Sequence, residues 1–391
     1  MKPSTAPLGI LGDGQLALML GESAHAQGLP FLAFSDNPDS SFARAFPEHF
    51  ILGNAKNQDD LTSFALQCSA ITLENEFLSA ETLTLVEEDS GTRIIPSPRS
   101  YKHFETKLAQ RAFYQSLKLA SPKWTTAMVR PEKVLSQISE HFSYPVVLKA
   151  SRGGYDGYGV RIVKNANEVG KALKDLKHSE ENLALIEECV LIRKEFAQGA
   201  LFDGKGGMIL LPLVETVQRN GICELVLSRP TLEAIELTGV AIKISSMMES
   251  LAKSRLIGLF SFEFFYTATG EVVINEGAPR PHNSQHLSLN ASPVSQFDLL
   301  IGFLASGTLP KVSSPISSKP SVMINLLGKS TGENYTLGLP KLPDGLVAHP
   351  KLYMKKESRV GRKMGHLNLI DESGTLNLVE IGERVLREYT L

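Results

Sequence analysis

A glycine-rich loop between two short apolar runs constrains this chain more than any other feature. Four glycines lie within seven residues in the segment 153–159, between the strand-like runs Val146–Ala150 and Val160–Val163. Glycine frees the backbone, so the amide groups of such a loop can fold over phosphate oxygens. Lys149, near the end of the first run, would add a positive charge beside them. A plain surface hairpin does not need so many glycines, so the segment predicts a phosphate-binding flap between two strands.

The first hundred residues alternate short apolar runs with amphipathic stretches, which predicts a parallel, doubly wound α/β sheet. The expected strands are Leu8–Leu11, Phe31–Phe34, Phe50–Leu52, Ile71–Leu73 and Arg93–Ile95. The expected helices are Gln15–Gln27, Gln58–Cys68 and Ala80–Glu88, followed by a longer one with an apolar stripe over Lys102–Leu119.

The remainder of the chain has an α+β pattern. Its further strand-like runs are Leu183–Ile186, Gly206–Val214, Phe260–Tyr266 and Glu271–Glu276. A stretch rich in serine and proline, 312–321, precedes a small, mostly β module. We therefore divide the chain into an N-terminal domain (1–98), a central domain (99–312) whose flap part spans about 121–187, and a C-terminal module (322–391).

Composition excludes several classes of protein. The 391 residues carry a formal charge of −2, so no global field attracts nucleic acid or an anionic membrane. The three cysteines are far apart in sequence and lack CxxC spacing, which indicates reduced thiols without a zinc site. We see neither a signal-peptide core nor an apolar run long enough to cross a bilayer, so a cytoplasmic location is expected.

The turn Gly12-Asp13-Gly14-Gln15-Leu16-Ala17, with Asp36 after the next expected strand, satisfies a dinucleotide-binding fingerprint. Its glycines would let the backbone approach a phosphate at a helix N-terminus. The alternative is a tight turn that any doubly wound domain can contain. Nothing else in the chain suggests hydride chemistry, so NAD binding is the weaker interpretation.

Two glutamates face each other in the expected hairpin 260–276. If Thr269-Gly270 forms a two-residue turn, the register brings Glu263 opposite Glu276. Facing carboxylates flanked by apolar residues repel each other and are costly to desolvate. A divalent cation such as Mg²⁺ removes both penalties, because it binds one or two carboxylates together with nucleotide phosphates. A solvated face for both glutamates is the alternative.

Two further clusters of polar residues accompany these motifs. The run 185–188 ends in Glu187 and Glu188, with Glu195 shortly after, where an acid at a strand end could meet adenine and ribose hydroxyls. Directly after the hairpin, the segment 277–284 brings Arg280 and His282 to its metal end, where they could clamp a small anion. A solvated helix start and a structural turn are the respective alternatives.

Five fixed cations lie within nine residues in the C-terminal module, with glycines close by. They are Lys355, Lys356, Arg359, Arg362 and Lys363. Such a run can form a phosphate clamp or a merely solvated basic face. A nucleic-acid patch is disfavoured, because aromatic residues are not interleaved and the net charge is slightly acidic.

Taken in order, these motifs resemble the 5-(carboxyamino)imidazole ribonucleotide synthases, the ATPase subunit of phosphoribosylaminoimidazole carboxylase. The resemblance covers almost the whole chain. It includes the glycine-rich turn, Arg152-Gly-Gly-Tyr-Asp-Gly-Tyr-Gly159, Glu187-Glu188, the Glu263/Asn275-Glu276 hairpin, Ala278-Pro-Arg-Pro-His-Asn-Ser284, Val322-Met-Ile-Asn-Leu-Leu-Gly328 and Gly361-Arg-Lys-Met-Gly-His366.

The resemblance implies a three-part ATP-grasp fold, usually dimeric, that joins bicarbonate to the exocyclic amine of 5-aminoimidazole ribonucleotide. ATP would become ADP and phosphate by way of carboxyphosphate, and the product would pass to a separate mutase in purine biosynthesis. The chemistry needs a metal and cations rather than a side-chain nucleophile. A water-excluding flap would protect the intermediate.

The resemblance also implies a role for each matching residue. ATP would meet Lys149, Gly153, Gly154, Gly157, Gly159, Glu187, Glu188, Val190, Glu195, Asn275 and, at the position of a family arginine, Lys102 or His103. Mg²⁺ would lie on Glu263 and Glu276, and bicarbonate or carboxyphosphate on Arg280 and His282. The ribonucleotide would meet Gln15, Leu16, Tyr155, Asp156, Lys356, Arg359, Arg362 and Lys363, with Tyr155 and Asp156 also counted among the catalytic residues.

The chain departs from the family pattern at several positions. They are Ala17 and Leu18, where the family has glycine and arginine, Phe77 after Glu74-Asn75-Glu76, His103, and Gln218 in Val217-Gln-Arg-Asn-Gly221. These departures leave the flap and metal motifs intact and bear on the acceptor substrate. Two alternatives therefore stay open: a related ATP-grasp ligase with a different acceptor, and a non-catalytic ATP-binding paralogue.

Overall fold

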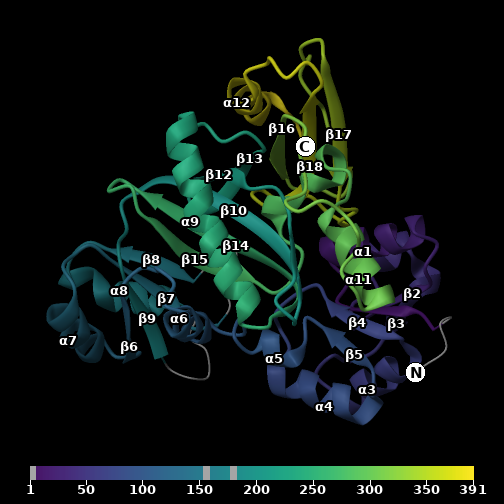
Figure 1. Cartoon of the computed structure of the whole chain (residues 1–391), viewed down its shortest axis with the longest axis horizontal. Helices are drawn as coiled ribbons and strands as arrows, with labels where there is room; N and C mark the ends of the chain where they lie inside the picture. The colour runs from purple at the N-terminus through teal and green to yellow at the C-terminus, as the bar shows by residue number, and fades with distance from the viewer. Residues whose placement is uncertain (1–5, 153–158, 177–182) are drawn as a thin grey trace.

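The computed structural model describes residues 6–152, 159–176 and 183–391. Figure 1 shows an N-terminal sheet, a small four-stranded sheet, and a large sheet that continues into the C-terminal part of the chain. Within the described ranges, no helix is both long enough and apolar enough to cross a membrane.

Five parallel strands form the N-terminal sheet, in the order β3-β2-β1-β4-β5. The strands are β1 (Leu8–Leu11), β2 (Phe31–Ser35), β3 (Phe50–Leu52), β4 (Ala70–Leu73) and β5 (Arg93–Ile95). The helices are α1 (Gln15–Ala26), α2 (Ser41–Ala45), η1 (Pro47–His49), α3 (Gln58–Gln67) and α4 (Ala80–Ser90). The predicted doubly wound sheet is confirmed, and its strand order reverses between β1 and β4, where such sheets bind ligands.

The helix expected over Lys102–Leu119 was predicted wrongly at its start. Helix α5 (Pro98–Tyr101) ends first, a turn follows, and α6 (Lys107–Ser116) begins five residues later than expected. The cause is a local cap, because the Thr106 hydroxyl accepts a hydrogen bond from the amide of Ala109 at 3.0 Å. Lys107 therefore lies in the first turn of this helix.

A four-stranded antiparallel sheet carries the flap segment, in the order β6-β9-β7-β8. Its strands are β6 (Trp124–Met128), β7 (Val146–Ala150), β8 (Val160–Val163) and β9 (Leu183–Glu188), and its helices are α7 (Pro131–His141), η2 (Ala166–Glu168) and α8 (Val169–Asp175). Buried Val134 and Ile138 of α7 pack against Leu148 and Ile186. The glycine-rich segment thus joins neighbouring strands β7 and β8, as predicted.

The large sheet runs β15-β14-β10-β12-β13-β16-β18-β17, with β11 paired to β10. Its strands are β10 (Ile192–Asp203), β11 (Met208–Leu210), β12 (Val214–Arg219), β13 (Ile222–Leu227), β14 (Ile257–Thr267), β15 (Val272–Ala278), β16 (Ser321–Leu327), β17 (Leu346–Leu352) and β18 (Lys363–Asp371). The accompanying helices are α9 (Ala234–Lys253), η3 (Asn283–Gln285), α10 (Ser288–Ala291), α11 (Gln296–Ser306) and α12 (Leu378–Glu388). Because β13 pairs with β16, the sheet is continuous from the central region into residues 321–391.

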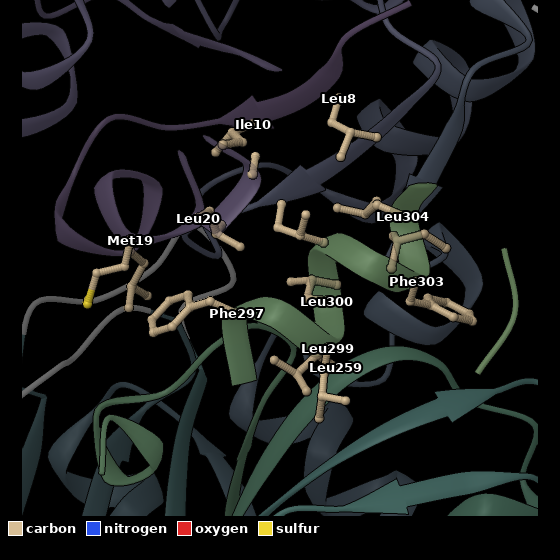
Figure 2. Close-up of a cluster of buried hydrophobic side chains, with 14 of the residues drawn as sticks. Leu8, Ile10, Met19, Leu20, Leu259, Phe297, Leu299, Leu300, Phe303 and Leu304 are labelled. Carbon is tan, nitrogen blue, oxygen red and sulfur yellow. The ribbon is translucent and has the colours of Figure 1, made fainter. Parts of the chain in front are cut away.

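Helix α11 joins the N-terminal sheet to the large sheet. Figure 2 shows Phe297 and Leu300 of α11 in one buried cluster with Leu8 of β1 and Leu259 of β14. Each such side chain contributes about 1.5–3 kcal/mol when it leaves water. The cluster therefore holds the C-terminal ends of β1 and β4 in a fixed position relative to the β14–β15 hairpin, and the candidate site lies between them.

Candidate active site

Glu263 of β14 and Glu276 of β15 are Cα partners across the hairpin, as the sequence predicted. The turn that joins the strands is one residue longer than expected, because Tyr266 pairs with Val272. A β-bulge at Asn275, between the pairs that contain Phe264 and Glu263, takes up the extra residue. The two irregularities cancel, so both carboxylates stand at facing positions.

The two carboxylates differ in their affinity for a proton. Burial and the charge of Glu276 raise the pKa of Glu263 to about 7. Burial acts in the same direction on Glu276, but the charges of Lys107 and Lys149 outweigh it and lower that pKa to about 2. The Lys107 ammonium lies 3.1 Å from Oε1 of Glu276. Lys107 thus acts as a counter-ion to Glu276, whereas no lysine or arginine in the described part of the chain lies within ion-pair distance of Glu263.

The acidic pair fits a hard divalent cation. Among the residues that the structure describes, no group of three or more histidine, cysteine, aspartate and glutamate side chains gathers to hold a metal. Mg²⁺ does not need such a group, since one or two carboxylates suffice when substrate phosphates and water supply the other ligands. A bound cation would stabilise the ionised form of both carboxylates, including Glu263 with its raised pKa.

Lys149 lies in a ring of four residues from α6, β7, β9 and β15, of which Lys149, Arg111 and Glu187 are buried and Asn275 is half-buried. Its ammonium is 2.8 Å from Oε2 of Glu187 and 3.2 Å from Oδ1 of Asn275. Arg111 contacts the same two residues, at 2.5 Å from Oε1 of Glu187 and 2.6 Å from the carbonyl of Asn275. Burial lowers the pKa of Lys149, and the charges of Lys149 and Arg111 lower that of Glu187 despite its burial. Three members of this ring, together with Lys107, Gln110 and Glu276, line a narrow pocket that has no room for a water molecule as it stands.

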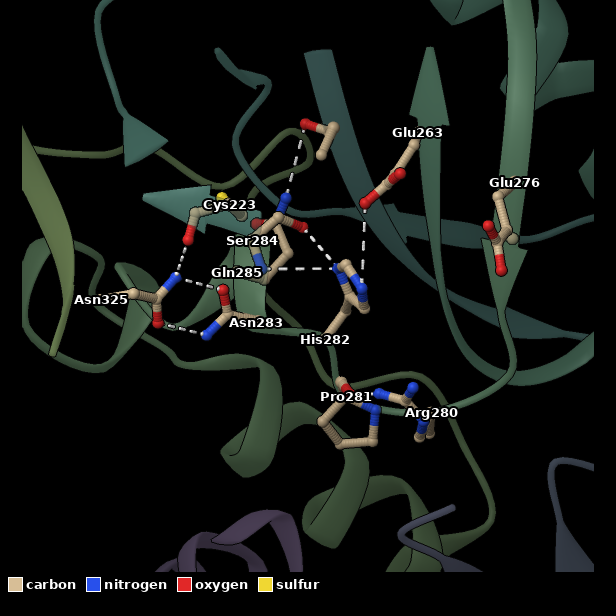
Figure 3. Close-up of polar contacts among 12 residues, drawn as sticks. Cys223, Glu263, Glu276, Arg280, Pro281, His282, Asn283, Ser284, Gln285 and Asn325 are labelled. Atoms are coloured by element: carbon tan, nitrogen blue, oxygen red, sulfur yellow. Dashed lines mark hydrogen bonds and ion pairs between the residues drawn. The ribbon is translucent and has the colours of Figure 1, made fainter. Parts of the chain in front are cut away.

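Arg280 and His282 lie on the loop after β15, and Figure 3 shows the His282 ring turned toward Glu263. Nε2 of His282 lies 3.9 Å from Oε1 of Glu263. Burial and the charges of Arg280 and Lys363 lower the pKa of His282 to about 3, so the ring is neutral at ordinary pH. Nδ1 lies 2.9 Å from the Ser284 hydroxyl and 3.4 Å from the Ser284 amide, and in the tautomer in which it accepts from both, the ring proton is on Nε2. The imidazole therefore presents a neutral donor to the site.

Asn283 fixes the far side of this loop. Its amide group exchanges two hydrogen bonds with Asn325 of β16, at 2.8 and 2.7 Å (Figure 3). Asn325 also donates to the carbonyl of Cys223 at 2.8 Å. Asn325 is fully buried, so these paired amides hold the loop that carries His282 to the large sheet.

The N-terminal domain supplies two carboxylates that the sequence argument left unassigned. Oε1 of Glu76 lies 2.8 Å from Nε of Arg280. The Glu74 carboxylate accepts hydrogen bonds from the amides of Gly14 and Ala17, at 3.0 and 3.2 Å. A carboxylate thus occupies the first turn of α1, where a dinucleotide phosphate would lie, which favours the tight-turn alternative. Gly12 is required here, because a Cβ would lie 2.1 Å from Cγ of Glu74.

The C-terminal cations do not lie equally close to the acidic pair. Lys363 begins β18, and its charge acts on both Glu263 and His282. Arg359 is 66% exposed and forms an ion pair with Glu357, and Lys356 lies 3.6 Å from Asp39 of the N-terminal domain. Arg362 donates to the carbonyl of Glu357 at 3.1 Å. Among the described residues, Lys363 is thus the one of these four cations whose charge is a main influence on Glu263.

The other predicted site residues are distributed around this centre. Gly153, Gly154, Tyr155, Asp156 and Gly157 lie outside the described residues, whereas Gly159 is described and has a φ of 86°. Burial and the charge of Glu263 raise the pKa of Glu195 to about 8. Glu188 accepts a hydrogen bond from the amide of Lys123 at 2.7 Å, and Val190 lies in the connection to β10.

Gln15 and Leu16 open helix α1, and only one of them can meet a ligand through its side chain here. Leu16 is buried in the core around α11, whereas Gln15 is half-buried.

Three family models match the chain in sequence order. They are a ribonucleotide synthetase preATP-grasp domain over residues 5–103, an ATP-grasp domain over 112–297 and a phosphoribosylaminoimidazole carboxylase C-terminal domain over 321–376. The N5-carboxyaminoimidazole ribonucleotide synthase of Synechococcus elongatus is 31% identical over 368 residues, which cover 93% of this chain and 89% of the relative. The chain belongs to the N5-carboxyaminoimidazole ribonucleotide synthase family.

Other members of the N5-carboxyaminoimidazole ribonucleotide synthase family agree in length and fold. The enzyme of Staphylococcus haemolyticus is 30% identical, with 98% of this chain and 96% of the relative covered. The crystal structure of the Staphylococcus aureus N5-carboxyaminoimidazole synthetase complexed with ADP superposes with a TM-score of 0.81 at 26% identity, covering 98% and 96% of the two chains. The ATP-grasp fold, the ligase class and ATP as the nucleotide follow from this membership.

The contact between ATP and Lys102 or His103 stays a prediction. The His103 ring stacks on Phe113 with centroids 4.1 Å apart, and Lys102 is exposed. Lys107 and Arg111, one helical turn apart on α6, line the narrow pocket beside Glu276. Neither residue was singled out from the sequence, although Thr106 followed by Lys107 was a readable signal of where the helix begins.

Proposed function

We propose that this chain uses ATP to join bicarbonate to the exocyclic amine of 5-aminoimidazole ribonucleotide, giving N5-carboxyaminoimidazole ribonucleotide, ADP and phosphate. The observation that carries the proposal is the place of Glu263 and Glu276. Lys107 contacts Glu276, Lys149 lies close by on Glu187, and His282 lies 3.9 Å from Glu263 on the loop that also carries Arg280. Phosphate and a small anion can therefore meet at the acidic pair.

The residues suit an anion that must first be phosphorylated. Bicarbonate is a poor electrophile, and carboxyphosphate is the activated form that an amine can attack. Arg280 offsets the charge of the bicarbonate, and the neutral His282 ring donates a hydrogen bond to it. Lys107 and Lys149 hold the phosphates of ATP in line with it. Catalysis rests on position and charge, as is usual for phosphoryl transfer.

Glu263 and Glu276 would hold Mg²⁺ in the working enzyme. When bound, the cation neutralises charge on the phosphoryl oxygens that are transferred. Lys107 is then free to exchange its contact with Glu276 for a phosphate oxygen, since the carboxylate has gained another cation.

The acceptor ribonucleotide belongs on the side of the C-terminal module. Lys363, with Lys356, Arg359 and Arg362, would hold its 5′-phosphate, and Gln15 would approach it from the first turn of α1. Tyr155 and Asp156, which lie outside the described residues, would also hold the ribonucleotide. We further propose a homodimer, and transfer of the product to a separate mutase.

Incorporation of labelled carbon tests the proposal. With [¹⁴C]bicarbonate, ATP and 5-aminoimidazole ribonucleotide, acid-labile label should appear on the ribonucleotide in proportion to ADP. Glu276→Gln is the matched control and should incorporate almost none. A different amine that accepts label more efficiently would instead establish a related ligase, and ATP binding without any incorporation would establish a non-catalytic paralogue.

A further inference from the structure

We propose that Arg111 is a positioning residue that holds the bulge at Asn275, and through it the metal-binding register of Glu276. The inference rests on the proposed use of ATP with a divalent cation at this site. Arg111 touches neither a nucleotide nor a reacting atom in this account. It acts through two neighbours, the carbonyl of Asn275 and the carboxylate of Glu187.

Because of the bulge, the backbone carbonyl of Asn275 takes its hydrogen-bond donor from outside the hairpin. In the three-residue turn that the hairpin adopts, an unbroken ladder would pair Glu263 with Asn275 and would turn Glu276 to the opposite face. The extra residue at Asn275 prevents this slip, but it interrupts the ladder of hydrogen bonds. A buried carbonyl without a donor is costly. Nη1 of Arg111 supplies the donor at 2.6 Å.

The second arm of Arg111 ties the same carbonyl to the small sheet. Nε lies 2.5 Å from Oε1 of Glu187, whose other oxygen is 2.8 Å from the Lys149 ammonium. Lys149 in turn lies 3.2 Å from Oδ1 of Asn275, which closes the ring. The arrangement joins β15 of the large sheet to β7 and β9 of the small sheet. It therefore sets the distance between the metal-binding carboxylate and the phosphate-binding lysine.

An arginine suits this position better than a lysine. Its planar fork donates in two fixed directions, to a carbonyl and to a carboxylate, whereas an ammonium at the end of a flexible stem is a single point of charge. Only 2% of Arg111 is exposed, so water cannot replace a lost donor. Substitution by lysine retains the charge that Glu187 needs, but leaves the bulge carbonyl without its partner.

Isothermal titration of ADP, with EDTA and with Mg²⁺, tests the proposal in Arg111→Lys. The variant should fold, with a melting temperature a few degrees below that of the wild type, because the bulge carbonyl loses its donor. Its affinity for ADP in EDTA should change little, while the increase in affinity that Mg²⁺ produces should fall roughly ten- to a hundredfold, the effect of one charge-assisted hydrogen bond. Arg93→Lys is the matched control, because Arg93 donates to the carbonyl of Leu304 at 2.6 Å, far from the site. It should retain the full Mg²⁺ effect.

A second variant separates the two contacts of the bulge residue. Asn275→Ala removes the oxygen that Lys149 contacts but keeps the carbonyl that Arg111 contacts, so the Mg²⁺ effect on ADP affinity should persist. The proposal is overturned if Arg111→Lys keeps the wild-type Mg²⁺ effect, if Asn275→Ala loses it equally, or if Arg111→Lys does not fold. None of these titrations contains bicarbonate or the ribonucleotide, so a failure of the proposed carboxylation would be seen separately, as absent labelling by the wild type.

Discussion

Glu263 and Glu276 face each other across the β14–β15 hairpin because a turn that is one residue too long is offset by a bulge at Asn275. The pair is asymmetric. The pKa of Glu263 is raised to about 7, and that of Glu276 is lowered to about 2. Because of this asymmetry, we expect substitutions of the two glutamates to change stability in opposite directions, which two equivalent surface carboxylates would not do.

Both glutamine variants of this pair should lose turnover by orders of magnitude, but they should shift stability in opposite directions. At pH 8, which is above the raised pKa of Glu263, this carboxylate is ionised in the folded chain. Without a metal its buried charge opposes folding, so Glu263→Gln should raise the melting temperature in EDTA. Glu276→Gln removes the partner of Lys107 and should lower it. Calorimetry in EDTA, beside steady-state rates with Mg²⁺, measures both. Near-normal turnover in either variant would contradict the metal assignment.

Lys107, and neither Lys102 nor His103, should contact the phosphates of ATP. Lys107→Met should raise the KM for ATP roughly ten- to a hundredfold, because a charge-assisted contact at a partly buried site is lost. Lys102→Met is the matched control, since Lys102 is exposed, and His103→Ala should also leave the KM for ATP nearly unchanged. A larger effect from either control than from Lys107→Met would restore the original expectation.

The basic C-terminal segment should affect the ribonucleotide rather than ATP. Lys363→Met should raise the KM for 5-aminoimidazole ribonucleotide about tenfold or more, because its charge already reaches the acidic pair. Arg359→Met should have a smaller effect, since Arg359 is 66% exposed. Initial rates with each substrate varied in turn separate the two constants. If both variants weaken ATP alone, the segment belongs to the nucleotide site.

His366 should make the protein sensitive to acid. It is fully buried and its Nδ1 lies 2.9 Å from the Tyr353 hydroxyl, and burial lowers its pKa to about 3. The unfolded chain binds a proton near pH ~6.5 and the folded chain does not, so stability is complete above that pH and falls toward pH 3. The slope is about 1.4 kcal/mol per pH unit for each such histidine. Urea unfolding between pH 4 and 7 should show a shallower slope in His366→Gln, and equal slopes would refute this.

Sequence reasoning located the elements better than it located the side chains that act together. The parallel sheet followed from alternation, and Glu263 opposite Glu276 followed from period and register. The two-residue turn behind that register was wrong, and the correct pairing survived because the Asn275 bulge compensates for it. Bulges depend on tertiary partners such as Arg111, which no local pattern reveals.

Long-range partners account for the remaining differences. Glu74 occupies the N-terminus of α1 from sixty residues away, so the dinucleotide fingerprint carried no information about a phosphate. Lys107 and Arg111 were hidden because the helix was expected to begin at Lys102, and an error of five residues turns a different face toward the site. Periodicity predicts which face of a helix is apolar, but the cap at Thr106 decides where that helix begins.

The most direct test of the proposed reaction is ADP release measured with each substrate omitted in turn. The account predicts that release is fast only when bicarbonate and 5-aminoimidazole ribonucleotide are both present, at one ADP for each ribonucleotide consumed. Glu276→Gln should abolish that release. Release that is unchanged when the ribonucleotide is omitted, or that another amine supports more efficiently, would contradict the assigned acceptor.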